Sequence, residues 1–242
     1  MTPPAVPTPA EPTPPPPLAA IAEPATVRLI PTAYYKPPVL GPLVDDDAEA
    51  LEILADIEGL TSRRLRAQRF GLPDLDPREL VFRAWGHSHI NAAFAYARPA
   101  GNRFNGPHRG AWYCAFDDLT AIDEVGTHRT RELAHIGRFE DEAVYQALLA
   151  GFMGDFHDLR AADGAGRPAC LDPDPATGYP AGQRLAADLR AEGSRGIVYP
   201  SVRRPGGICL VAFEPHLVQN VRPAARWRLT WNGRPDFTAT TA

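Results

Sequence analysis

The chain has 242 residues, of which 44% are hydrophobic and 22% charged, so it holds enough apolar material for one sizeable core. Its formal net charge of −4 supplies no overall basic field, which argues against direct binding to nucleic acid or to an anionic membrane. The three cysteines are widely spaced and support neither a disulfide framework nor a zinc knuckle. The longest apolar runs are too short to cross a bilayer, and the first residues lack a secretory signal. We therefore expect a cytoplasmic protein.

Proline dominates the first 42 residues, which hold 14 of the 27 prolines. Such a segment offers few backbone donors and no apolar periodicity, so residues 1–42 are predicted to form an extended or disordered extension. It can serve as a passive tether, as a docking arm or as a secretion-related extension. The short stretch 27–35 is more apolar and can pack on the domain that follows.

The domain itself is predicted over residues 46–235, with a helical part at 46–70 and a core at about 78–232. Apolar residues at helical spacing predict a first helix from Asp46 to Gly59. Thr61 can cap a second helix over 62–70. Further along, residues 80–85 and 111–116 are strand candidates, and a helix capped by Asp117 or Asp118 should run to about His135.

The second half of the chain is predicted to mix helices and strands. Residues 141–155 are predicted to be helical because Val144, Leu148 and Phe152 fall on one helix face, and a further helix is expected at 183–192. Strands are predicted at 196–199, 208–213, 217–221 and 226–231. Because the order shows no regular βαβ alternation, we expect an α+β fold rather than a doubly wound sheet.

Two candidate binding residues lie in the middle of the chain. The segment 101–105 reads Gly-Asn-Arg-Phe-Asn, which favours a tight turn that presents the Arg103 guanidinium beside backbone amides and so suits a phosphate. Trp112 and Tyr113 are neighbours in a predicted strand and must face opposite ways. One of them can face a cleft and stack on a flat heterocycle, although for this motif alone core packing is the default interpretation.

Two further candidates are a carboxylate and a hydroxyl. Glu124 lies on an amphipathic helix, where an ordinary solvated position is the alternative, and Ser201 follows a strand that stops at Pro200. The chain has no G-x-S-x-G motif, which argues against a serine hydrolase. The pairs His87/His89 and Glu124/His128 have spacings that suit a metal, but no third ligand joins either pair, so no metal site is predicted.

Taken together, these motifs resemble the RES domain family, named for an arginine, a glutamate and a serine. The motifs are Arg83 in a strand candidate, then N-R-F-N, W-Y-C-A, the helix with Glu124, I-V-Y-P-S-V-R and G-G-I-C-L-V-A-F. The three name-giving residues fall on Arg103, Glu124 and Ser201, and the resemblance covers roughly residues 55–232. One departure is Phe104, where the family often has Trp after the arginine.

The resemblance implies a mixed β core with flanking helices, similar to ADP-ribosyltransferases. It also implies a toxin of a bacterial toxin–antitoxin pair that depletes NAD by hydrolysis or phosphorolysis, so that inorganic phosphate is a possible co-substrate and no cofactor beyond NAD is expected. The partner would be an antitoxin with a helix-turn-helix-type domain that blocks the cleft, and homo-oligomers or toxin–antitoxin hetero-oligomers are both open. Two alternatives remain: a mono-ADP-ribosyltransferase that modifies a protein, and a catalytically silent RES-like binding module.

The expected roles follow from the chemistry of NAD. Arg83 and Arg103 would neutralise the pyrophosphate through bidentate contacts. Glu124 would stabilise the positive charge that builds on the ribose, or hold its hydroxyls. Tyr113 would stack on or orient the nicotinamide, and Ser201 would bond to the nicotinamide side or to the ribose. The leaving group is already cationic, so no strong general acid is required.

Overall fold

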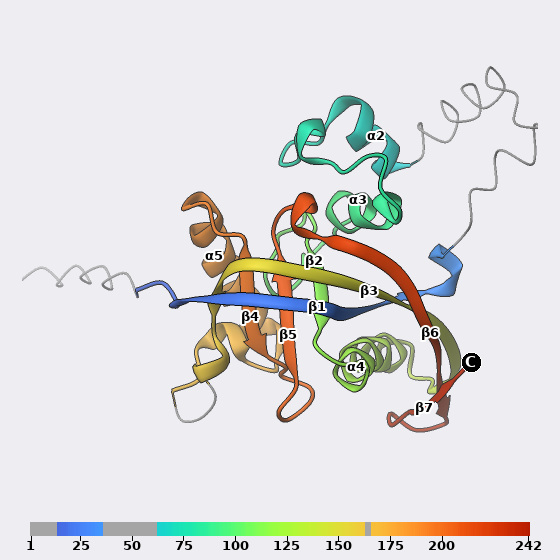
Figure 1. The fold of residues 1–242 in the computed structure, drawn as a ribbon. Coiled ribbons are helices and arrows are strands. Elements are labelled where there is room, and N and C mark those ends of the chain that lie inside the picture. The colour runs from blue at the N-terminus through green and yellow to red at the C-terminus, as the bar shows by residue number, and fades with distance from the viewer. Residues whose placement is uncertain (1–13, 36–61, 163–165) are drawn as a thin grey trace, which may run out of the picture.

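One long strand, β3 (Glu140–Asp158), organises the fold. It pairs antiparallel with β1 (Leu18–Pro31) on one side and with β6 (Gln219–Asn232) on the other, and its end pairs parallel with β4 (Gly196–Pro200). The computed structural model describes residues 14–35, 62–162 and 166–242. Within these residues the chain is a mixed α+β domain, as the sequence predicted (Figure 1).

The sheet has seven strands in the order β1-β2-β5-β4-β3-β6-β7, completed by β2 (Trp112–Ala115), β5 (Ile208–Ala212) and β7 (Thr238–Thr241). The additional pairing of β1 with β3 joins both ends of the β1-β2-β5-β4-β3 series into a closed ring. The antiparallel pair β6–β7 extends from the ring through β3. Residues 18–31 are therefore built into the sheet that carries the rest of the domain.

Four α-helices flank the sheet among the described residues: α2 (Arg63–Phe70), α3 (His87–Ala95), α4 (Asp118–Ile136) and α5 (Pro175–Ala191). In Figure 1, α2 and α3 lie on one side of the β1–β3 layer and α4 lies on the other. Short 3-10 turns connect these elements at Thr32–Tyr34, Pro77–Glu79, Arg160–Ala162, Ala169–Leu171 and Pro215–Leu217. The sheet is thus covered on both faces.

The core has two parts, one on each face of the sheet. Neighbouring strand residues alternate between them: Ala147 belongs to the cluster with α4 and α5, whereas Leu148 belongs to the cluster with α2 and α3. Ile197 and Val198 divide in the same way. Side chains in a strand alternate between faces, so a sheet buried on both sides needs continuous apolar runs, as found in β4 and β5.

The predicted helix over residues 141–155 is wrong, because this segment is β3. Val144, Leu148 and Phe152 are four residues apart, a spacing that shares a face in a helix and also in a strand. Local periodicity therefore could not separate the two structures. The decision comes from pairing with β1 and β6, whose residues are distant in the chain.

The predicted disordered extension over residues 1–42 is wrong for residues 18–31, which form β1. Ile21, Val27 and Leu29 are buried there. Pro24, which lacks an N–H, falls at a register shift between Glu23 and Thr26, where the pairing with β3 is interrupted. Residues 1–13 and 36–42, like the helix expected at 46–59, lie outside the described residues.

The strand predicted at 80–85 is also wrong, because these residues form the turn that leads into α3. Arg83 has a φ of 59°, which is incompatible with a strand. The Asn91 side chain instead satisfies Val81, accepting from its N–H at 3.0 Å and donating to its carbonyl at 2.8 Å. The Asn91 side-chain amide thus bonds both backbone groups of Val81, which a neighbouring strand would otherwise have bonded.

Other predicted elements are confirmed with adjusted ends. The strand at 111–116 is β2, and the helix capped by Asp117 is α4, with Thr120 N donating to Asp117 Oδ1 at 2.8 Å. The helix at 62–70 is α2, and its cap is Ser62 rather than Thr61. The strands at 196–199 and 208–213 are β4 and β5.

Two predicted boundaries near the end of the chain need correction. Helix α5 begins at Pro175 rather than at 183, because Asp174 caps it by accepting from Ala176 N at 3.0 Å. The two strands expected at 217–221 and 226–231 are one strand, β6, which begins at Gln219.

Candidate active site

A pocket of about 490 Å³, here called the inner pocket, opens where β1, β2, α4 and α5 meet. Its volume lies within the usual range for a small-molecule site. The polar and ionisable side chains that line it are Arg28, Tyr34, Tyr96, Arg98, Asn102, Arg103, Tyr113, Cys114, Glu124, His128, Tyr179, Tyr199, Arg203 and Cys209. The structure therefore brings together three of the predicted site residues, Arg103, Tyr113 and Glu124.

The fourth predicted residue, Ser201, lies behind Glu124 and is not among the lining residues. Its Oγ donates to Glu124 Oε1 at 2.7 Å. The same hydroxyl oxygen accepts from the backbone N–H groups of Arg203 and Arg204, each at 3.1 Å. Two incoming donors direct the single hydroxyl proton to the carboxylate, so Ser201 fixes the orientation of Glu124.

A cysteine borders the same carboxylate. Cys209 Sγ lies 3.9 Å from Glu124 Oε1. Burial, followed by the charge of Glu124, raises the pKa of this thiol well above its ordinary value. Cys209 is therefore a neutral thiol beside the carboxylate and offers no thiolate nucleophile.

The segment 101–105 is the predicted tight turn. Gly101 has a φ of 70°, which glycine adopts without strain, and Asn102 N donates to Asn105 O at 2.9 Å. The Tyr113 hydroxyl closes the turn, since it accepts from Phe104 N and donates to Asn105 Oδ1, both at 2.9 Å. Burial raises the pKa of Tyr113, which keeps it a neutral phenol. Tyr113 thus supports the arginine turn as well as lining the pocket.

Arg103 is more buried than the sequence suggested, with an exposed fraction of 6%. Its Nη1 donates to Cys170 O at 2.6 Å and to Asp172 O at 2.8 Å, and its guanidinium lies 5.5 Å from the Tyr179 ring centre. Gly178 and Gly182 allow α5 to approach, because a Cβ at either position would come within 3 Å of Arg103 atoms. Arg103 therefore ties the 170–172 segment and α5 to the pocket wall.

Arg83 does not join this site. It is exposed in the turn before α3 and is absent from the residues that line the inner pocket. The structure places Arg28 there instead. Its Nη1 donates to Tyr113 O at 2.9 Å, and its guanidinium lies 4.8 Å from the centre of the Trp112 ring. Burial lowers the pKa of Arg28 to about 10, so it remains a cation at neutral pH.

Sequence reasoning missed Arg28 because it lies in the proline-rich extension, where the stretch 27–35 was expected to pack on the domain but not to supply a site residue. One signal was available: residues 26–30 read Thr-Val-Arg-Leu-Ile, a charge inside an apolar, β-branched run. A lone charge in such a run indicates a strand that passes a polar pocket.

Several arginines converge on one side of the inner pocket. Arg203 Nη2 and Arg131 Nη2 both donate to Pro173 O, at 2.7 and 3.1 Å. His128 lies among them. Its pKa is lowered to about 4, first by burial and then by the charges of the surrounding arginines Arg98, Arg131, Arg203 and Arg103. This side of the pocket is positive, and the Glu124 carboxylate lines the same pocket.

The pairs His87/His89 and Glu124/His128 lie on helices α3 and α4. His87 and His89 lie in the first turn of α3 rather than in a strand, and His89 stacks on Tyr35 with ring centres 5.5 Å apart. Within residues 14–35, 62–162 and 166–242, no three His, Cys, Asp or Glu side chains gather closely enough to hold a metal ion.

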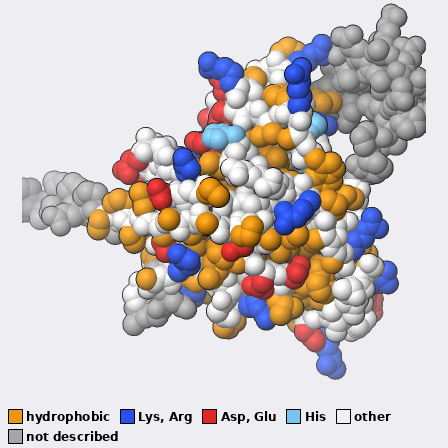
Figure 2. Space-filling view, in the orientation of Figure 1, with side chains coloured by type: hydrophobic (Ala, Val, Ile, Leu, Met, Phe, Trp, Pro, Cys, Tyr) orange, Lys and Arg blue, Asp and Glu red, His pale blue; other side chains and the backbone are white. Residues whose placement is uncertain are grey.

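Two surface properties bear on partners. None of the helices in the described ranges combines the length and apolar character needed to cross a membrane. Figure 2 shows basic and acidic side chains interspersed over one face of the molecule. That face carries no continuous band of positive charge of the kind that tracks a nucleic-acid backbone.

The RES domain family model matches residues 80–232, which is more than half of the chain, and the protein belongs to that family. No curated protein sequence matches the chain. Among solved structures, the chain is similar to one in the crystal structure of the M. tuberculosis MbcT–MbcA toxin–antitoxin complex. That similarity has 15% sequence identity and a TM-score of 0.42, and covers 88% of this chain and 87% of the other. Strand β1, and Arg28 with it, precedes the segment that the family model matches.

Proposed function

We propose that this protein cleaves the bond between nicotinamide and ribose in NAD and acts in the cytoplasm as a growth-inhibiting toxin. One observation carries the proposal: a single pocket is lined by the Glu124 carboxylate, held by Ser201, and by the cationic side chains of Arg28, Arg103 and Arg203. NAD needs both charges, because its pyrophosphate is anionic and its scissile ribose becomes cationic as the bond breaks.

Glu124 is the residue that would act on the reacting carbon. As the C–N bond breaks, its electron pair returns to the nicotinamide ring, which leaves neutral, and positive charge develops on the ribose. A carboxylate whose orientation is already fixed stabilises that charge without reorganising. Water then gives ADP-ribose and a proton, whereas phosphate gives ADP-ribose 1-phosphate. Both acceptors share the first step.

The pyrophosphate would lie on the positive side of the pocket. Arg203 lies on that side, whereas Arg28 lines the pocket beside Trp112 and Tyr113. Both offer guanidinium donors, which match phosphate geometry. Arg103 contributes its charge, while its Nη1 is engaged by two carbonyls that hold the wall in place. Tyr113 presents its ring to the same space, where it can contact the nicotinamide.

Family membership supports a protein partner. RES toxins are neutralised by antitoxins with helix-turn-helix-type domains, and we propose such a partner for this chain, covering the mouth of the inner pocket. A direct test is growth inhibition on expression alone and its reversal on co-expression with the protein from an adjacent reading frame.

The proposed chemistry is tested with purified protein free of any partner. Incubation with NAD should release nicotinamide, and mass analysis with and without inorganic phosphate should identify ADP-ribose or its 1-phosphate. ADP-ribose attached to added protein would instead assign a transferase. A folded protein that releases no nicotinamide under either condition would overturn the proposal.

A further inference from the structure

A second pocket of about 680 Å³, here called the outer pocket, adjoins the inner one. Three residues, Arg98, His128 and Tyr179, line both. The outer pocket is formed by the loop 98–101, the second half of α4 and the first half of α5. The two pockets are therefore parts of one groove that runs from Glu124 to the solvent.

The lining of the outer pocket suits a flat heterocycle next to a phosphate. Flat or apolar faces come from Pro99, Pro175, Tyr179 and Pro180, together with the imidazoles of His128 and His135. Aromatic rings of this kind stack on nucleobases. Arg98 and Arg131 add positive charge, and the one carboxylate in the lining, Glu132, is paired with Arg98 and Arg129. The guanidinium of Arg131 favours the phosphate end of a nucleotide.

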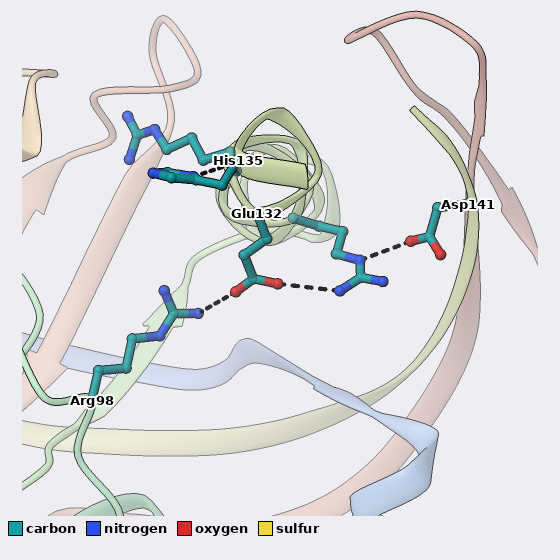
Figure 3. Close-up of polar contacts among 6 residues, drawn as sticks. Arg98, Glu132, His135 and Asp141 are labelled. Carbon is teal, nitrogen blue, oxygen red and sulfur yellow. Dashed lines mark hydrogen bonds and ion pairs between the residues drawn. The ribbon is translucent and has the colours of Figure 1, made fainter. Parts of the chain in front are cut away.

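Ionic contacts tie one wall of this pocket to the sheet, as Figure 3 shows. Arg98 forms an ion pair with one carboxylate oxygen of Glu132 on α4, at 3.2 Å. Arg129 forms an ion pair with the other Glu132 oxygen at 3.3 Å and a second one with Asp141 on β3 at 2.7 Å. His135 Nδ1 donates to Arg131 O at 2.6 Å, which fixes the ring on the surface of α4. The loop 98–101 is thus held against α4 through Arg98.

A second tether joins the same loop to α5. Gln183 Nε2 donates to Ala100 O and to Asn102 O, each at 2.9 Å. The loop is therefore bonded to both helices that border the pocket. A cleft formed in advance needs little ordering when a ligand binds, which favours affinity.

We propose that the outer pocket binds the adenylate half of NAD, the part that is remote from the scissile bond. This inference rests on the proposed function, which places the reacting ribose at Glu124. The pyrophosphate then lies among the arginines at the boundary between the pockets, and the second nucleoside extends past Tyr179 into the outer pocket. The outer pocket is on this account the part of the site that distinguishes a dinucleotide from a mononucleotide.

The test fills the outer pocket and compares two substrates. Ala176 is exposed in the first turn of α5 and lines the outer pocket, whereas Ala187 is exposed on the same helix and does not. Ala176→Phe should raise the KM for NAD by about tenfold or more with kcat nearly unchanged, the size of effect that loss of one base stack produces. Ala187→Phe should leave both constants as in the unmodified protein.

Nicotinamide mononucleotide provides the matched substrate, because it has the same scissile bond and lacks the adenylate half. The unmodified protein should cleave it with a kcat/KM at least about tenfold below that for NAD, and Ala176→Phe should not lower that value further. Equal kcat/KM for the two substrates, or an unchanged KM for NAD in Ala176→Phe, would overturn the inference while leaving the proposed function intact.

Binding of ADP-ribose, measured by calorimetry, separates the two proposals without turnover. Ala176→Phe should weaken ADP-ribose about tenfold, and Ala187→Phe should not. If Ala176→Phe weakens ADP-ribose binding, Ala187→Phe does not, and the protein fails to cleave NAD, then the outer pocket is the adenylate site and the proposed function is wrong. Undetectable ADP-ribose binding would reject the outer pocket. If Ala176→Phe fails to fold, His135→Ala, which removes one exposed ring from the same pocket, should show a smaller change in the same direction.

Discussion

The Ser201 hydroxyl donates to Glu124 Oε1 at 2.7 Å across 77 positions of sequence. The backbone N–H groups of Arg203 and Arg204 donate to that same hydroxyl. Glu124 comes from α4 and Ser201 follows β4, so the contact depends on how the helix lies on the sheet. The serine of the RES motif therefore acts here as a positioning residue for the glutamate.

Ser201→Ala should lower kcat for NAD and change KM little. A hydrogen bond to a charged group contributes about 1.5–3 kcal/mol, which corresponds to roughly ten- to a hundredfold. Glu124→Gln should reduce kcat further, because it removes the charge while keeping the shape. If Ser201 acts through Glu124, the double variant should be no slower than Glu124→Gln alone. Fully additive losses would show that the two residues act separately.

Arg103→Ala should destabilise the fold as well as slow turnover. It leaves two carbonyls, Cys170 O and Asp172 O, without the donor that pairs them in a largely buried position. Each unsatisfied group costs about 1–3 kcal/mol, so denaturant unfolding should show a loss of that order or more. Arg203→Ala, whose bond to Pro173 O is exposed, is the control and should lose less. If Arg103→Ala unfolds with the same free energy as the unmodified protein, the Arg103 contacts contribute nothing to stability.

Arg28→Ala should raise the KM for NAD, whereas Arg83→Ala should not. Arg28 lines the inner pocket and Arg83 is exposed outside it. Loss of a charge-assisted contact to phosphate corresponds to about ten- to a hundredfold in affinity. Arg28→Lys should restore binding only in part, since a point charge lacks the planar fork. The measurement is steady-state kinetics with thermal melts for each variant. A larger effect at Arg83 than at Arg28 would contradict the pocket described above.

His128 should make the protein sensitive to mild acid. Its pKa in the folded state is lowered from 6.5 to about 4, first by burial and then by Arg98 and the other arginines. Between these two pH values His128 is protonated in the unfolded chain but not in the folded protein. The free energy of unfolding therefore falls as pH drops from 6.5 toward 4. His128→Asn should flatten this dependence of the melting temperature over that window. Burial lowers the pKa of His89 and His157 too, but these residues stay in both proteins, so the difference isolates His128. Identical slopes would contradict this assignment.

The parts of the site that the sequence predicted depend on short stretches of chain. Glycine and asparagines around Arg103 specify a turn, Asp117 specifies the start of α4, and the apolar runs of β4 and β5 specify buried strands. The motif order also identified the family. Tyr113 and Glu124 could be selected because the helix and strand that carry them have clear local signals, although their contacts with Asn105 and Ser201 could not be read from spacing.

Tertiary structure decided the rest, because strands acquire their identity from distant partners. The segment 141–155 fits helical and strand spacing equally, and pairing with β1 and β6 selects the strand. Residues 18–31 of the proline-rich segment form β1 for the same reason, since they pair with β3 and β2 and their apolar side chains are buried. That pairing brings Arg28 to Tyr113, 85 residues away, whereas Arg83, which lies nearer in sequence, is left in an exposed turn. The sequence by itself determined the types of side chain available and the local turns. Which of these side chains line the pocket was determined by pairing between strands that are distant in the chain.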